Sequence, residues 1–306
     1  MKILVGNTGF VGSNLKHQTH FDALYNSANI QASFGSKPEL LVYAGIYSRK
    51  FLANQFPEED NNHTLQAIDN IRKINPGKIV LISTIDVLSE IVSVDETTIS
   101  EENHVQPYGL HRLKVEQWVQ SNIPEHLIVR LPAIYGQNIK KNFIYDIICK
   151  IPAMLNEAHY NKLKTVSDRA SEFYHRDIKG YYHLNNLTGK AKDDLMFFLN
   201  QLNFNATHFT DSRSVFQFYP LAYLWQHIET ALQHRIQLLH LATEPVSAEA
   251  LYRHVTGESF VNEIHSAPPA YNFRSLHAEL FGGRDGYIFT RDFILDDIRQ
   301  FIHNYP

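Results

Sequence analysis

Several protein classes are excluded by what this sequence lacks. It holds a single cysteine, Cys149, among 306 residues, so an internal disulfide framework is excluded. No segment approaches the ~20 apolar residues of a membrane-spanning helix, and the apolar run within Met1–Gly6 is too short for a signal peptide. The formal charge of −4 is spread without long runs of one sign. We therefore expect a cytoplasmic protein that binds neither nucleic acid nor a membrane surface.

A metal site is not expected either, although the chain has 17 histidines. Pairs such as His17 and His20 lack a cysteine or carboxylate at ligand spacing. What the chain does have is 44% hydrophobic residues, over a length that can bury a sizeable core. These residues are grouped in short runs and not in one long segment.

The short apolar runs predict buried strands of a parallel sheet. Four of them stand out, at residues 3–5, 40–44, 79–82 and 127–131. Continuous apolarity without alternation is typical of strands that are covered on both faces. A further strand is expected within Phe21–Tyr25, and another at Gln237–Leu241. The fold class predicted from this pattern is α/β, with a doubly wound parallel sheet of the Rossmann type.

Helical patterns separate these runs. The clearest is Pro107–Ser121, where Pro107 suits a first helical turn and Leu110, Leu113 and Trp118 are expected to face the sheet. An amphipathic helix is expected from Leu221 to Leu232. Another is expected over Ser247–Val255, with Ser247 as N-cap and Gly257 just past the end. The alternation of helix and strand therefore continues into the second half.

The sequence predicts two domains. Residues 1–142 plus about 215–256 are expected to form the dinucleotide-binding Rossmann domain. Residues from about 143 to 214 are rich in polar and aromatic residues and less sheet-like, and we expect them to form mainly helices and loops. Together with residues 257–306, they are expected to form a smaller, mostly C-terminal substrate lobe.

A glycine-rich loop follows the first strand directly. It reads Gly6-Asn7-Thr8-Gly9-Phe10-Val11-Gly12 and leads into a helix. Glycines allow a tight turn and let backbone N–H groups approach a pyrophosphate at the start of a helix. The loop therefore predicts dinucleotide binding by these seven residues.

The second strand is not followed by an acidic residue. An acid there would bind the adenosine ribose of NAD, but this chain has Asn26 and Ser27. Either these small polar residues bind the ribose, or a 2′-phosphate is accommodated with Arg49 or Lys50 as counter-charge. The choice between NAD and NADP stays open at this point.

Tyr108 and Arg112 lie four residues apart on the predicted helix and share one of its faces. A phenol has a reference pKa of about 10, so it exchanges protons near neutral pH only if a neighbouring positive charge stabilises its phenolate. Arg112 can supply that charge, and the pair then forms a proton-transfer site. On the spacing alone, an exposed tyrosine and arginine without this role is the simpler interpretation.

Taken together, these motifs resemble the extended short-chain dehydrogenase/reductase family, in particular its epimerase/dehydratase group acting on nucleotide sugars. The resemblance rests on the glycine loop and on five later segments, in the family's order. They are Ala44-Gly45, Ser83-Thr84-Ile85-Asp86-Val87, Tyr108-Gly109, Glu116, and Arg130-Leu131-Pro132-Ala133-Ile134-Tyr135-Gly136.

The resemblance implies a site and a reaction. Thr84 would hydrogen-bond the reacting sugar oxygen, and Tyr108 would exchange a proton with it while NAD or NADP gives or takes a hydride. It implies further cofactor contacts, from Ala44, Gly45, Ser83, Tyr108, Arg112 and Pro132. The substrate would be a nucleotide sugar. A homodimer formed by paired helices is common in the family.

The chain departs from the family at two positions. Arg112 stands where the family has lysine, and Ile85-Asp86 stand where sugar-nucleotide dehydratases have an acidic pair. The second change favours epimerisation or reduction over dehydration, with Asp86 keeping part of an acid/base role or being a solvated loop carboxylate. His111 shares a face with Tyr108, but we expect it to be a polar surface residue.

The substrate contacts and the reaction remain less defined. Thr84, Asn142 and Arg274 are candidate substrate-binding residues, Arg274 because arginine binds phosphate well. We predict an NAD(P)-dependent oxidoreductase or epimerase acting on a nucleotide-activated sugar. Two alternatives remain. One is a non-catalytic NAD(P)-binding sensor or scaffold, and the other is a reductase of a non-sugar carbonyl compound.

Overall fold

The chain forms two compact units. The computed structural model describes residues 1–305, apart from the side chain of His104. The first unit consists of Met1–Asn138, Val215–Val246 and Pro269–Asp297. The second consists of Ile139–Ser214, Ser247–Pro268 and Ile298–Pro306. No helix in the described part of the chain combines the length and apolarity needed to cross a bilayer.

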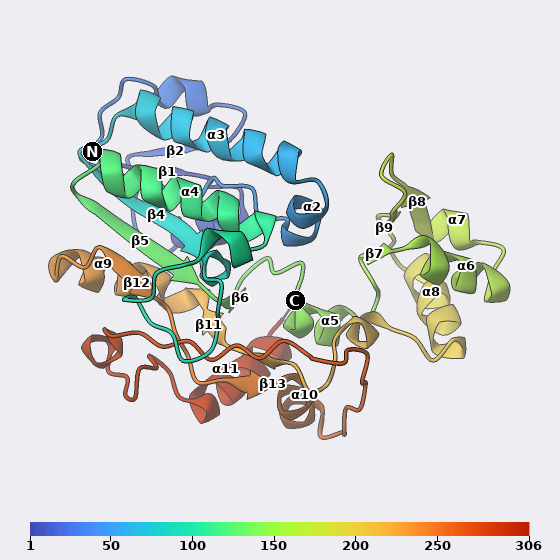
Figure 1. Cartoon of the computed structure of the whole chain (residues 1–306). Helices are drawn as coiled ribbons and strands as arrows, with labels where there is room; N and C mark the ends of the chain where they lie inside the picture. Colours follow the sequence, from blue (N-terminus) through green and yellow to red (C-terminus); the bar gives the residue numbers. More distant parts are fainter. Residues whose placement is uncertain (306) are drawn as a thin grey trace. The chain divides into compact units, whose positions relative to one another are not determined.

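A six-stranded sheet is the centre of the first unit, with strand order β12-β5-β4-β3-β1-β2 (Figure 1). Each neighbouring pair of strands is parallel. The strands are β1 (Lys2–Val5), β2 (Ala23–Tyr25), β3 (Leu40–Tyr43), β4 (Lys78–Thr84), β5 (His126–Leu131) and β12 (Leu238–His240). The predicted doubly wound parallel sheet is confirmed, and each predicted apolar run lies in one of its strands.

Helices cover both faces of this sheet. They are α1 (Phe10–Leu15), α3 (Pro57–Ile74), α4 (Pro107–Asn122) and α9 (Leu224–Gln233). Successive strand residues face opposite sides: Leu41 packs in the cluster beneath α3 and α4, and Val42 packs in the cluster beneath α1 and α9. Figure 1 shows α3 and α4 on the same side of the sheet. Burial on both faces is the reason that the strands are continuously apolar.

The face of α4 that packs on the sheet differs from the expected one. The contact is made by Val115, Val119 and Ile123. Leu113 packs instead against Ile85 and Val87, which follow β4, and Trp118 is half-buried at the edge of the sheet cluster. The helix lies across the end of β4, so its first turns contact the loop after that strand and only its later turns contact the sheet.

Other predicted elements are confirmed. The 221–232 pattern forms a short 3₁₀ turn followed by α9, and α10 (Ala248–Thr256) begins after Ser247. The Ser247 side chain accepts a hydrogen bond from the backbone N–H of Ala250, and Gly257 ends the helix with a φ of 78°. Local capping chemistry therefore determines both ends of α10.

Two segments lie in a different unit from the one expected. Residues 247–256 group with the second unit, and residues 269–297 group with the first. Backbone pairing explains the second case: Phe289 bridges to Thr243 and Asn272 bridges to Val92. The backbone N–H of Ile288 also donates to the carbonyl of Ala242 at 2.8 Å. These long-range pairings leave no local pattern in the sequence.

The second unit has its own apolar cluster, which includes Leu163, Phe173, Tyr174 and Leu195. Its helices are α5 (Phe143–Cys149), α6 (Glu157–Val166), α7 (Ala170–Phe173) and α8 (Lys190–Gln201), together with α10. It also contains a three-stranded antiparallel sheet of β7 (Met154–Leu155), β9 (Tyr182–Leu184) and β8 (Tyr174–Arg176). The sequence predicted mainly helices and loops here, and these three short strands were not expected. Strands of two or three residues are too short to leave a sequence pattern.

The remaining elements are short strands and two helices. They are α2 (Lys50–Gln55), β6 (Ala133–Tyr135), β10 (Val215–Phe216), β11 (Phe218–Pro220), β13 (Val246–Ser247) and α11 (Arg291–His303). β6 pairs with β11, and β10 pairs with β13. α2 packs against α3 and α4 near their first turns.

Candidate functional site

The glycine loop is folded tightly between β1 and α1. Gly6 has a φ of 92°, and a Cβ at this position would lie 2.4 Å from the carbonyl oxygen of Ala44. A Cβ at Gly12 would lie 2.1 Å from the carbonyl oxygen of Gly6. Any side chain would therefore separate the loop from its neighbours. The structure brings the loop, Ala44 and Gly45 together at one end of the sheet.

This end of the sheet is a topological switch point. β1 lies between β2 and β3, so the chain leaves β1 to one side for β2 and returns to the other side for β3. In open α/β sheets, ligands bind outside the carboxyl ends of the strands at such a point. The glycine loop and the Ala44-Gly45 turn follow the carboxyl ends of β1 and β3.

The loop has an unused hydrogen-bonding group. The side-chain oxygen Oδ1 of Asn7 is buried and has no hydrogen-bond partner among the described residues. A buried acceptor of this kind is stabilised when a donor binds to it. The orphaned acceptor and the tight turn that only glycine allows both fit a dinucleotide.

No carboxylate follows β2. The backbone N–H groups of Gly6 and Asn7 both donate to the carbonyl of Tyr25, so the end of β2 lies beside the loop. The next residue, Asn26, accepts from the backbone N–H of Ala28 through its Oδ1. Asp22 precedes the strand and accepts from the backbone N–H of Lys2. The side chains directly after the strand are thus small and polar, as expected from the sequence.

The end of β4 presents Ser83 and Thr84 in two different environments. Ser83 is buried, and its hydroxyl donates to Oε1 of Glu116. Thr84 is half-buried, and its Oγ1 accepts from the backbone N–H of Asp86 at 3.2 Å. The hydroxyl of Thr84 also makes a long contact of 3.4 Å to Oδ2 of Asp86. Successive strand residues face opposite ways, so only Thr84 lies on the same side as Asp86.

Tyr108 lies in the first turn of α4, directly beside the loop after β4. A Cβ on its neighbour Gly109 would lie 1.8 Å from the carbonyl oxygen of Asp86, so backbone meets backbone at this point. The backbone N–H of Tyr108 donates to Oδ1 of Asn54, on α2, at 2.9 Å. The structure therefore brings the Tyr108 turn next to the turn that begins at Thr84.

Arg112 is almost fully buried and lies 4.1 Å from the centroid of the Tyr108 ring, measured from its guanidinium carbon. Its guanidinium donates to Oδ2 of Asp60, on α3, and to the backbone carbonyl of Tyr47. It also donates to the carbonyl of Tyr108 at 3.3 Å. The side chain of Arg112, a candidate cofactor contact, is therefore fixed between α3 and α4.

Burial raises the pKa of Tyr108 above the ordinary value of a phenol. The charge of Arg112 opposes this increase, as the sequence suggested, and so does that of Lys50. Asp86 and Asp60 act in the same direction as burial, and the net shift is upward. The charge of Arg112 therefore acts in the expected direction, but burial outweighs it.

His111 is buried, contrary to the expectation of a surface residue. Its Nδ1 lies 2.7 Å from Oδ2 of Asp60, the carboxylate that also binds Arg112. Asp60 comes from the first turn of α3, a segment more than fifty residues upstream. The sequence spacing within α4 contained no indication of this partner.

A second ion pair lies on the Thr84 side of the site. Nζ of Lys50, at the start of α2, donates to Oδ1 of Asp86 at 2.7 Å and to the hydroxyl of Tyr271 at 3.2 Å. The Tyr271 hydroxyl donates to the same Oδ1 at 3.2 Å. Lys50 was a candidate for a 2′-phosphate contact, but its amine instead binds the carboxylate next to Thr84. Sequence reasoning missed this cluster because its three members come from three distant segments.

A buried polar network supports the ends of β4 and β5. Arg130 binds Glu116 through three hydrogen bonds of 2.6–3.2 Å. Its Nη1 lies 3.2 Å from Nε2 of His240, and burial lowers the pKa of His240 to about 4. The Glu116 and Arg130 of the family-like motifs therefore form a structural pair behind the site.

The two other candidate substrate residues have structural contacts. The side chain of Asn142 accepts from the backbone N–H groups of Ile144 and Tyr145 and caps α5, in the second unit. Arg274 is exposed in the first unit, with its guanidinium carbon 5.5 Å from the centroid of the Tyr287 ring. A role in substrate binding stays a prediction for both.

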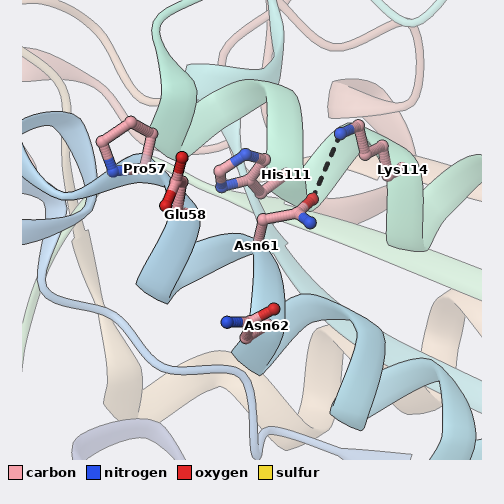
Figure 2. Close-up of a pocket in the computed structure, with 6 residues that line it drawn as sticks. All are labelled: Pro57, Glu58, Asn61, Asn62, His111 and Lys114. Carbon is pink, nitrogen blue, oxygen red and sulfur yellow. Dashed lines mark hydrogen bonds between the residues drawn. The ribbon is translucent and has the colours of Figure 1, made fainter.

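A surface pocket of about 430 Å³ lies between the starts of α3 and α4 (Figure 2). It is lined by Pro57, Glu58, Asn61, Asn62, His111 and Lys114. Nζ of Lys114 bridges it by donating to Oδ1 of Asn61 at 3.2 Å. The pocket contains none of the glycine loop, Thr84 or Tyr108, so it is not part of the candidate site.

Solved structures provide the comparison for this geometry. The chain is similar to the dTDP-4-dehydrorhamnose reductase of Yersinia enterocolitica, with a TM-score of 0.66, 14% identity, and coverage of 100% of this chain and 99% of that one. The likeness shows that this chain has the same fold as that reductase. Neither a protein-family model nor a curated protein matches the sequence.

Two further enzymes share this fold. The dTDP-4-dehydrorhamnose reductase of Bacillus anthracis, in complex with NADP, has a TM-score of 0.64 and 13% identity, over 99% of this chain and 98% of that one. The UDP-glucose 4-epimerase of Thermotoga maritima, with UDP-glucose, has a TM-score of 0.60 and 10% identity, over 100% of this chain and 98% of that one. At these identities, the likeness establishes the fold.

Proposed function

We propose that this protein is an NAD(P)-dependent oxidoreductase or epimerase that acts on a nucleotide-activated sugar, with Tyr108 as its acid/base. The observation that carries the proposal is the placement of the Tyr108 turn against the turn after Thr84, at the sheet end that also holds the glycine loop. Similar solved structures include enzymes in complex with NADP, NADPH and NAD, and enzymes with UDP-glucose. These complexes support the class of cofactor and substrate.

The residues of the glycine loop fit the cofactor. Oδ1 of Asn7 would accept a hydrogen bond from a hydroxyl of the bound cofactor, and Gly6 and Gly12 would hold the tight turn that lets backbone N–H groups approach the pyrophosphate. When bound, the nicotinamide supplies hydride transfer. Asn26 and Ser27, in place of an acid after β2, leave NAD and NADP both open.

The chain's own residues would manage the proton and the substrate oxygen. Thr84 would donate a hydrogen bond to the reacting oxygen and orient it. Tyr108 would give a proton to that oxygen on reduction or take it on oxidation. Burial raises the pKa of Tyr108 in the unliganded protein, and the charges of Arg112 and Lys50 oppose that increase.

The test combines cofactor binding with turnover. We expect NADH or NADPH to bind the wild-type protein and Tyr108→Phe equally in fluorescence titrations. With nucleotide-sugar substrates such as 4-keto sugars, Tyr108→Phe should lower kcat by about 10²-fold or more. The matched control is Tyr252→Phe, which removes the same hydroxyl from α10 in the second unit and should keep full turnover. Unchanged turnover of Tyr108→Phe would exclude its role.

A second candidate is a non-catalytic NAD(P)-binding sensor or scaffold. It is favoured by one observation, namely that Arg112 is bound to Asp60 and the Tyr47 carbonyl and so cannot extend to a ribose. This candidate predicts cofactor binding with no turnover on any nucleotide sugar.

A cytoplasmic location and a homodimer formed by paired helices also stay predictions.

A further inference from the structure

Lys50 has contacts that a surface lysine of a short helix does not need. Its ammonium binds both Asp86 and Tyr271, although its side chain is 46% exposed and the carboxylate is 20% exposed. Burial opposes the charge on Lys50, but the attraction of Asp86 and Tyr271 outweighs burial, and the pKa of Lys50 is raised. The lysine is therefore held as a cation at this place.

The position of α2 directs Lys50 to the site. Lys50 and Asn54 are four residues apart and share a face of α2. Asn54 accepts from the backbone N–H of Tyr108, while Lys50 binds Asp86, whose carbonyl abuts Gly109. One face of α2 thus contacts both turns that would carry the reaction.

Asp86 creates a difficulty for that reaction. A carboxylate beside Tyr108 disfavours the phenolate, and a carboxylate beside Thr84 competes with substrate for its hydroxyl hydrogen. In the structure, Oδ1 of Asp86 is bound by Lys50, and Oδ2 is left 3.4 Å from the Thr84 hydroxyl, a long hydrogen bond. The contact with Lys50 accounts for the weak hydrogen bond between Asp86 and the Thr84 hydroxyl.

We propose that Lys50 is a positioning residue of this site, which neutralises Asp86 and holds its carboxylate so that Thr84 and Tyr108 stay available to a substrate oxygen. The inference rests on the proposed function for the roles of Thr84 and Tyr108, but its test does not require turnover. Lys50 on α2 then supplies part of the positive charge near Tyr108, because the charge of Arg112 is paired with Asp60.

Several charged or titratable groups face Tyr108 or its neighbours from the surrounding elements. They are Lys50 on α2, Asp60 on α3, His111 and Arg112 on α4, Asp86 after β4, and Tyr271 in the loop that contacts Asp86. Lys50 and Arg112 favour the phenolate, and the two carboxylates disfavour it. Removing Lys50 leaves the carboxylate of Asp86 unopposed, whereas removing both Lys50 and that carboxylate leaves the balance nearly unchanged.

The experiment follows Tyr108 directly in the protein without cofactor. Protein labelled with 3-fluorotyrosine is titrated by ¹⁹F NMR, because the fluorine lowers phenol pKa values into a range where the protein is folded. The Tyr108 signal is assigned by its loss in Tyr108→Phe. We expect Lys50→Met to shift the titration of Tyr108 to higher pH, and Lys50→Arg to leave it near the wild-type position. The double variant Lys50→Met with Asp86→Asn should return it toward wild type.

Lys114→Met is the matched control, because Lys114 lies on the helix of Tyr108 but contacts Asn61 on α3. It should leave the titration unchanged. An unshifted titration in Lys50→Met, or no return in the double variant, would overturn the proposal. The titration does not depend on turnover, so the two hypotheses can fail separately. If Lys50 does not position Asp86, Tyr108→Phe still lowers kcat. If the proposed function is wrong, the Lys50 variants still shift the titration of Tyr108.

Discussion

The guanidinium of Arg112 and the carboxylate of Asp60 form an ion pair in which both side chains are only 3% exposed. The pair joins α4 to the first turn of α3, and the Tyr47 carbonyl and His111 add further hydrogen bonds to its two members. It explains how an arginine can occupy the position of the family's lysine. The residue holds two helices together next to Tyr108, and its planar fork satisfies acceptors that a lysine could not reach at once.

This pair predicts the effect of changing Arg112. Arg112→Met should lower the free energy of unfolding by about 3–5 kcal/mol, because Asp60 is left as an uncompensated buried charge. Urea unfolding followed by circular dichroism measures the change. The double variant with Asp60→Asn should recover a large part of the loss. A double variant as unstable as the sum of the single ones would contradict this coupling.

Gly109 is required by a close approach and not by an unusual φ. In Gly109→Ala the new Cβ would lie 1.8 Å from the carbonyl oxygen of Asp86, so α4 must move away from that turn. We expect a loss of about 1–3 kcal/mol in unfolding free energy, despite the higher helix propensity of alanine. Gly77→Ala is the control, since its nearest contact would be an ordinary 3.6 Å, and it should be neutral or stabilising. Equal stability of the two variants would refute the argument.

Gly12 should matter for cofactor binding. The Cβ of Gly12→Ala would lie 2.1 Å from the Gly6 carbonyl oxygen, which forces α1 away from the loop. We expect the Kd for NADH or NADPH to rise about tenfold or more, equivalent to at least about 1.4 kcal/mol. Isothermal titration calorimetry measures it, with thermal unfolding to verify that the variant is folded. Unaltered affinity in a folded variant would place the cofactor elsewhere.

His227 predicts a dependence of stability on pH. Burial lowers its pKa from 6.5 to about 4, and its Nδ1 lies 2.7 Å from the Tyr219 hydroxyl. Between these values the unfolded chain binds the proton that the folded protein does not, so stability falls as pH decreases from 6.5 to 4. The share of His227 is about 2 kcal/mol at pH 5 relative to pH 7.

His227→Asn tests this share. The asparagine Oδ1 can replace Nδ1 as acceptor for Tyr219 but does not titrate. We expect its unfolding free energy, measured by urea at pH 7, 6 and 5, to fall less steeply than that of the wild-type protein. His240 remains in the variant, and burial lowers its pKa to about 4 too, so part of the slope should persist. Parallel pH profiles would show that His227 does not carry the predicted share.

Short sequence patterns were sufficient to predict the elements whose structure depends mainly on neighbouring residues. The apolar runs became strands because both faces of the sheet are covered, and Ser247 and Gly257 ended α10 as N-cap and C-cap. The glycine loop was recognisable because its three glycines lie within seven residues, and Gly12 packs against the Gly6 carbonyl of the same loop. The contacts of His111 and Lys50 were not recognisable, because Asp60 and Asp86 belong to segments far from them in the sequence.

The sequence by itself therefore determined the strands of the six-stranded sheet, the ends of α10, the glycine loop and the fold class of this protein. Only the tertiary structure decided what the charged residues around Tyr108 do. Arg112 shares a helical face with Tyr108, as its spacing requires, but burial raises the pKa of Tyr108 and Asp60 holds the guanidinium. Spacing fixes which side chains can be neighbours on one helix, whereas desolvation and ion pairing depend on the other elements that fold against it.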